Sequence, residues 1–165
     1  MMDDIVHVKM DREDAIVLKT YDHSETVALG NMIGHVLKGS EIICLDGDLG
    51  AGKTTFTKGV ARGIGVKGIV NSPTFTILKI YEGDMTLYHM DVYRVDNEDF
   101  ELSEYFEEGG VCVIEWANNI SDLLPNERID IQINDLGENQ RNVQIKSIGK
   151  IYDEIVKELY ENFIY

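Results

Sequence analysis

Basic residues are scarce in this chain. Its 165 residues include 30 acidic residues but only 15 lysines and arginines, so the formal net charge is −15. Tight, autonomous binding to nucleic acid or anionic lipid needs a cationic surface that displaces counterions, and this composition argues against it. If the protein serves RNA chemistry, we expect another molecule to hold the RNA.

Long hydrophobic runs and cysteines are also scarce. No apolar run approaches the ~18 residues that span a bilayer, and the N-terminal Met1-Met2-Asp3-Asp4 lacks the basic and apolar regions of a signal peptide. We therefore expect a cytoplasmic protein with no membrane association. The two cysteines, Cys44 and Cys112, lie inside short apolar runs, where a reduced thiol packs as a small hydrophobe.

The remaining composition is that of a compact globular protein. Apolar residues make up 44% of the chain, too many for a disordered acidic chain, and 165 residues are enough to bury a sizeable core. Pro73 and Pro125 are the only prolines, and there is no repeat, low-complexity tract or linker. We predict that residues 1–165 form a single domain.

Strand-like and helix-like patterns alternate along the chain. Strands are predicted over residues 14–20, 41–45, 74–81, 85–90 and 111–114, and helices over 22–37, 54–64, 96–106 and 151–163. Two further alternating segments, 128–133 and 142–148, flank the turn residues Asp135-Leu136-Gly137 and predict an antiparallel hairpin. The alternation predicts an α/β sheet with helices on both faces.

A glycine-rich loop follows the buried strand 41–45. It reads Gly47-Asp48-Leu49-Gly50-Ala51-Gly52-Lys53-Thr54, the spacing of a phosphate-binding loop. Glycines let successive N–H groups face an anion, and the following helix adds its positive N-terminus. We expect Lys53 to reach the β- and γ-phosphates and the Thr54 hydroxyl to ligate Mg²⁺. The predicted fold is then a P-loop NTPase-like, three-layer α/β/α fold with a central, mainly parallel sheet and a C-terminal antiparallel hairpin and helix.

A second glycine pattern, Gly63-Ile64-Gly65-Val66-Lys67-Gly68, matches the dinucleotide-binding fingerprint. That fingerprint must follow a strand and open a helix, whereas this pattern follows a predicted helix. We interpret it as the end of the helix and a loop.

Acidic residues at strand ends are candidates for metal and water binding. Glu115 closes the strand 111–114, where a nucleotide site places its metal carboxylate, although a solvated acid at a strand end is the alternative. In Tyr88-His89-Met90-Asp91-Val92-Tyr93-Arg94, alternation puts His89, Asp91 and Tyr93 on one face. Asp91 is a candidate to position water or a metal-bound water, and Arg94 to touch phosphate; an ordinary ion pair explains both equally well.

Two other segments are candidates to contact the nucleotide, namely the loop at residues 72–74 and Trp116. Ser72-Pro73-Thr74 occupies a loop between helix and strand, where many such folds sense the γ-phosphate, and a plain turn is the alternative. Trp116 directly follows Glu115 and either covers the site or belongs to the core.

Taken in their order along the chain, these motifs resemble those of the bacterial TsaE family, also called YjeE. The resemblance is carried by residues 47–55, 71–76, 88–94 and 114–116, and it runs from about residue 25 to residue 133. It implies a Mg-dependent P-loop ATPase required for threonylcarbamoylation of adenosine 37 in tRNA (t6A), without being the transferase itself. The implied partners are TsaB and TsaD, whose heterodimer performs the transfer. ATP use by the TsaE protein would reset that heterodimer, and contact with tRNA would be indirect.

The resemblance also implies a role for each matching residue. The phosphates would be held by Gly47, Asp48, Leu49, Gly50, Ala51, Gly52, Lys53, Thr54 and Thr55. Thr54 and Glu115 would hold Mg²⁺, and Lys53, Asp91 and Glu115 would serve hydrolysis, with the roles of the two acids open to exchange. Ser72 and Thr74 would form the switch, and Trp116 would lie near the nucleotide or a partner surface.

Three other readings compete. A small P-loop kinase usually closes an arginine-bearing lid over its acceptor, and the five arginines here are not clustered. A GTPase usually carries an Asn-Lys-x-Asp element, which does not occur in the chain. A scaffold that binds nucleotide without turnover has the same sequence signals, because hydrolysis depends on fine placement of water.

Overall fold

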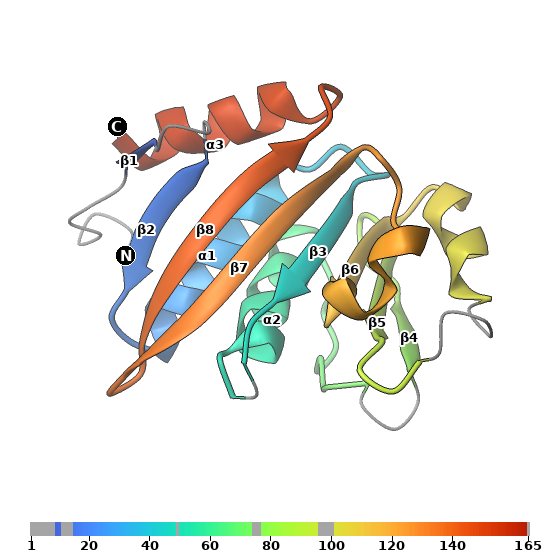
Figure 1. Ribbon diagram of the computed structural model, residues 1–165, viewed down its shortest axis with the longest axis horizontal. Coiled ribbons are helices and arrows are strands. Elements are labelled where there is room, and N and C mark those ends of the chain that lie inside the picture. Colours follow the sequence, from blue (N-terminus) through green and yellow to red (C-terminus); the bar gives the residue numbers. More distant parts are fainter. Residues whose placement is uncertain (1–8, 11–14, 49, 74–76, 96–100, 165) are drawn as a thin grey trace.

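The strands form one mixed sheet. The computed structural model describes residues 9–10, 15–48, 50–73, 77–95 and 101–164. Within these residues the sheet has eight strands in the order β1-β2-β8-β7-β3-β6-β5-β4. Their bounds are β1 Lys9–Met10, β2 Ile16–Thr20, β3 Ile42–Asp46, β4 Leu78–Tyr81, β5 Leu87–Asp91, β6 Val111–Glu115, β7 Arg128–Gly137 and β8 Gln140–Ile148. The central strands β7, β3, β6 and β5 run parallel, with antiparallel strands on either side (Figure 1).

Helical segments cover both faces of this sheet, as predicted. The α-helices α1 (His23–Val36), α2 (Lys53–Gly63) and α3 (Asp153–Ile164) pack on one face. The 3-10 helices η3 (Leu102–Glu107) and η4 (Ala117–Leu123) lie against the other. The predicted α/β fold class is confirmed, with short 3-10 segments forming the third layer.

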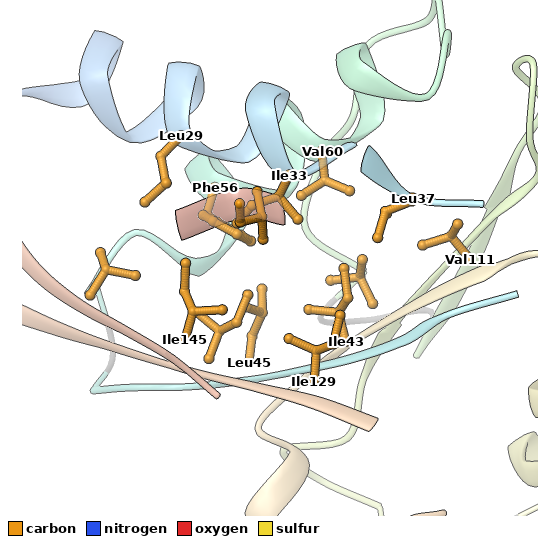
Figure 2. Packing of buried hydrophobic residues seen from close by; sticks show 14 of the residues in the cluster. Leu29, Ile33, Leu37, Ile43, Leu45, Phe56, Val60, Val111, Ile129 and Ile145 are labelled. Atoms are coloured by element: carbon orange, nitrogen blue, oxygen red, sulfur yellow. The ribbon is translucent and has the colours of Figure 1, made fainter. Parts of the chain in front are cut away.

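Alternation along the central strands explains the two cores. Ile43 and Leu45 of β3 point towards Ile33 and Phe56 of the α-helices, as Figure 2 shows, whereas Cys44 belongs to the cluster on the opposite face. Cys44 and Cys112 are both buried and free, as their apolar surroundings predicted. Burial on both faces accounts for the continuous apolar run of β3.

Helix α1 begins where its sequence predicted. The Asp22 carboxylate accepts a hydrogen bond from Glu25 N at 2.8 Å, which caps the first turn.

The crossing of α1 with α2 brings backbones into contact through glycines. A Cβ built on Gly30 would lie 2.3 Å from Phe56 O, and one built on Gly59 would lie 2.1 Å from Val27 O. Larger residues at these positions would force the helices apart.

The predicted hairpin forms, but its turn lies elsewhere. The turn residues are Glu138 and Asn139, with φ of 55° and 66°, and not Asp135-Leu136-Gly137. Gly137, with φ of 88°, lies at a register shift of β7, and its N–H donates to Asp135 Oδ1 at 2.8 Å. The glycine therefore serves a β-bulge, and the strand continues past the place where a glycine usually ends it.

The C-terminal helix also differs in detail from its prediction. Helix α3 starts at Asp153, so Ile151 precedes it and is 66% exposed instead of extending the apolar stripe. Ile155 and Leu159 are buried as predicted.

In the described part of the chain, no helix combines the length and the hydrophobicity needed to cross a membrane.

Candidate functional site

The loop between β3 and α2 has the strand–loop–helix setting that its sequence predicted. Gly52 is the N-cap of α2 and has a φ of +99°, and Gly50 has a φ of +78°, both in the left-handed region that favours glycine. Ala51 N donates to Asp48 O at 3.0 Å, which closes a tight turn. A Cβ on Gly47 would lie 2.2 Å from Ile133 O, so the loop starts in direct contact with β7.

Lys53 folds back over this loop. Its ammonium donates to Gly47 O at 2.7 Å and to Asp48 O at 2.9 Å, and it lies 3.8 Å from the centre of the Trp116 ring. The residue is only 5% exposed. Burial lowers the pKa of the Lys53 ammonium, and the nearby carboxylates, Glu115 first, offset part of that effect. The loop therefore holds a buried positive charge beside the N-terminus of α2, an arrangement that suits an anion.

Glu115 lies at the carboxyl end of β6 and faces α2. It pairs in register with Leu45 of β3 and with Asp91 of β5, so strand geometry fixes its place beside the loop. Thr54 Oγ1 lies 3.4 Å from both carboxylate oxygens of Glu115, which is longer than an ordinary hydroxyl–carboxylate hydrogen bond. The carboxylate is 3% exposed, which argues against the solvated-acid alternative.

His89 is the partner that holds the Glu115 carboxylate. Its Nε2 is hydrogen-bonded to Glu115 Oε2, and the imidazole is fully buried. The His89 Nδ1 has no hydrogen-bond partner among the residues that the structure describes. Strand alternation predicted that His89 and Asp91 share one face, but not that His89 binds Glu115, because the two residues are 26 positions apart in the sequence.

Asp91 and Trp116 complete this edge of the site. Asp91 is 5% exposed and accepts from Tyr93 N at 3.0 Å. Tyr93, which is 55% exposed, packs against Trp116 with ring centroids 4.7 Å apart and the ring planes tilted by 51°. Trp116 has a φ of 63°, an unusual value for a large side chain, and its ring lies between Lys53 and Tyr93. Trp116 thus covers the ammonium and also packs against the apolar cluster on the η4 face of the sheet, so both predicted alternatives hold in part.

A pocket of about 250 Å³ gathers most of the predicted residues. It is lined by His23, Gly50, Ala51, Gly52, Lys53, Thr54, Thr55, Ser72, Asp91, Glu115, Trp116 and Arg141. Ser72 therefore reaches the site from its loop. Leu49 and Thr74, predicted as a loop residue and a switch residue, lie outside the described residues. Arg94 is exposed and is not a lining residue.

Two lining residues were missed by the sequence reasoning. Arg141 belongs to β8, and its Nε donates to Ala51 O at 2.7 Å. His23 is the first residue of α1 and also lines the pocket. No pattern in the sequence indicated the Arg141 contact, because Asp135 was assigned to the turn, whereas in the structure it pairs with Arg141 across the hairpin.

The donor set fits a magnesium ion that arrives with a nucleotide. Mg²⁺ in such sites is held by one or two protein oxygens together with phosphate oxygens and water. Thr54 and Glu115 offer such oxygens beside the loop. Among the described residues there is no group of three His, Cys, Asp or Glu side chains that would hold a metal ion on its own.

The mixed sheet, with the glycine loop at the carboxyl edge of its parallel strands, defines a P-loop NTPase-like α/β protein. A sequence model of the family described as "Threonylcarbamoyl adenosine biosynthesis protein TsaE" matches residues 20–143. The chain belongs to the TsaE family.

Individual relatives agree with this assignment. The tRNA threonylcarbamoyladenosine biosynthesis protein TsaE of Bacillus subtilis is 46% identical over 144 residues, which cover 86% of this chain and 91% of the relative. The protein of the same name from Aquifex aeolicus is 44% identical over 124 residues, or 73% of this chain and 88% of the relative. The crystal structure of YdiB from Bacillus subtilis superposes with a TM-score of 0.81 at 40% identity, covering 94% of this chain and 97% of the other.

Proposed function

We propose that this chain binds and slowly hydrolyses ATP with Mg²⁺, and thereby serves t6A formation in tRNA in the cytoplasm by acting on a TsaB–TsaD complex. The observation that carries the ATP site is the buried Lys53 ammonium on the loop between β3 and α2. Glu115 and Thr54 lie side by side next to it. The names of the relatives carry the link to t6A.

Each residue has a role in this proposal. The backbone amides of residues 47–55 hold the phosphates, and Lys53 exchanges its loop carbonyls for phosphate oxygens. Thr54 and Glu115 hold Mg²⁺, which supplies neutralisation of the charge on the transferred phosphoryl group. Asp91 orients the attacking water, or exchanges this role with Glu115. Ser72 and Thr74 respond to the γ-phosphate.

The charge balance supports a role through protein contacts. With a net charge of −15, the chain is repelled by the tRNA backbone, so tRNA is met through the complex and not directly. TsaB and TsaD then perform the transfer, and nucleotide use by this chain resets them between turnovers.

Reconstitution of the tRNA modification over many turnovers tests the proposal. Purified TsaB, TsaD, tRNA and the threonylcarbamoyl donor should stop after few turnovers without this chain, and should resume with it but not with Lys53→Ala. Phosphate release by the chain alone should be slow and should rise when TsaB and TsaD are added. Full-speed release without partners would contradict the resetting role. Transfer of phosphate to a small metabolite would instead favour the kinase reading.

A further inference from the structure

Arg141 joins the hairpin β7–β8 to the glycine loop. Its side chain is 8% exposed, and its Nε donates to Ala51 O at 2.7 Å. Its Nη2 lies 3.4 Å from Gly50 O, a weaker contact with the neighbouring carbonyl. The guanidinium thus meets the loop on the carbonyl side of two successive peptides.

These contacts fix the direction of a backbone amide. The peptide group is planar and trans, so the Ala51 carbonyl and the Gly52 N–H point in opposite directions. Because Arg141 holds the carbonyl, the Gly52 N–H is turned to the other side of the loop, away from the guanidinium. Gly52 also fits Arg141 sterically, since a Cβ at this position would lie 3.3 Å from Arg141 Nε.

Asp135 holds the guanidinium in place. Arg141 Nη1 donates to Asp135 Oδ1 at 2.9 Å and to Gln140 O at 2.9 Å, and the two charged residues are directly opposed in the hairpin register. The carboxylate keeps the nearly buried cation paired. A planar guanidinium reaches acceptors in several directions at once, which a lysine ammonium on its flexible stem does not reproduce.

From this geometry we propose that Arg141 is a positioning residue for nucleotide binding. Although Arg141 lines the same pocket, all three of its guanidinium nitrogens are engaged by protein oxygens, so it acts through the loop. By holding the Ala51 and Gly50 carbonyls, it sets the amide side of the loop in advance of the ligand. A preformed site loses less conformational entropy on binding. This inference rests on the proposed function, because it concerns the same ATP site.

The test compares Arg141→Lys with a matched control, Arg128→Lys. Arg128 lies at the other end of the same hairpin and makes equivalent contacts, with Nε 2.9 Å from Asp130 Oδ1 and Nη1 2.8 Å from Pro125 O. In Arg141→Lys, the Kd for MgATP measured by titration calorimetry should rise about tenfold or more. The KM for ATP should rise with it, while kcat stays within about twofold, because no contact to the reacting atoms is lost. Arg128→Lys should leave Kd and KM unchanged.

A second measurement separates positioning from general stabilisation. Without nucleotide, hydrogen exchange of peptides from residues 47–55 should be faster in Arg141→Lys than in the wild type, while peptides from α3 exchange as before. A purely structural role would accelerate both regions together and leave the MgATP affinity of the folded fraction unchanged. That pattern would overturn the proposal, as would unchanged loop exchange.

The outcomes also distinguish this inference from the proposed function. A wild-type chain that fails to bind MgATP would refute the proposed function. A wild-type chain that binds MgATP, with equal affinity in Arg141→Lys, would overturn the role of Arg141 alone. If Arg141→Lys does not fold, a measurement on the wild type decides. The Nε–H of Arg141 should exchange with water more slowly than the Nε–H of the exposed Arg62. Equal exchange rates would overturn the proposal.

Discussion

Replacing Lys53 by alanine should weaken MgATP binding strongly and change the stability of the ligand-free protein little. In the free protein the Lys53 ammonium donates to two neutral carbonyls, at 2.7 and 2.9 Å, beside the Trp116 ring. With ATP bound, these neutral acceptors are exchanged for anionic phosphate oxygens, which adds charge–charge attraction to hydrogen bonds that were charged at the donor alone. We expect the exchange to contribute about 2–3 kcal/mol, which is roughly a 30- to 150-fold increase in Kd for the variant.

The stability of the free protein responds to two opposing effects. Lys53→Ala removes the two hydrogen bonds, but it also removes a buried charge whose pKa is lowered by desolvation. The loop carbonyls border an open pocket, so water replaces the ammonium. The free energy of unfolding in urea should therefore change by only about 1 kcal/mol.

Titration calorimetry with MgATP and urea unfolding without nucleotide measure the two quantities. Lys58→Ala is the matched control, because it removes the same charge from an exposed position on the same helix. A Lys53→Ala protein that is folded and binds MgATP within about twofold of the wild type would refute the reasoning, since 2 kcal/mol is far outside that range.

Three further changes test other parts of the structure. Glu115→Gln should weaken the apparent Mg²⁺ affinity in ATPase titrations by about tenfold or more, since a coordinating charge is lost; an unchanged magnesium dependence in the folded variant would remove this residue from the metal site. Gly59→Ala should lower the free energy of unfolding by roughly 3 kcal/mol because its Cβ would meet Val27 O at 2.1 Å, whereas Gly68→Ala, with open space around it, should not; equal urea midpoints would contradict the close contact. Burial raises the pKa of Cys112 from 9.0 to about 12, so above pH 9 the unfolded chain releases a proton that the folded chain keeps. Through this thiol, stability should fall with a slope that approaches about 1.4 kcal/mol per pH unit above pH 10, and Cys112→Ala should show a correspondingly shallower slope between pH 10 and 11; equal slopes would contradict the burial argument.

The sequence predicted those features that depend on neighbours along the chain. The apolar run before Gly47 identified a strand buried on both faces, and Asp22 with Glu25 identified the start of α1. The spacing from Gly47 to Thr54 identified the loop, because its geometry follows from the residues within it. Strand alternation correctly placed Asp91 and His89 on one face.

Features that depend on pairing between distant segments were not predicted. The partner of Glu115 is His89 because β5 and β6 lie side by side, and Arg141 reaches the loop because β7 lies beside β3. The hairpin turn was misplaced because Gly137 marked a bulge, while Glu138 and Asn139 adopt left-handed backbone conformations without being glycine. A local pattern does not distinguish these two uses of a glycine.

The glycine-lined crossing of α1 and α2 has a mechanical consequence for whatever happens at the loop. Where side chains fill an interface, changes of rotamer absorb small displacements. At Gly30 and Gly59 the backbones are in direct contact, so no side chain at these positions can adjust in this way. We expect the two helices to move together as a rigid unit. We therefore expect a shift of the first turn of α2, which carries Lys53 and Thr54, to displace α1 as well.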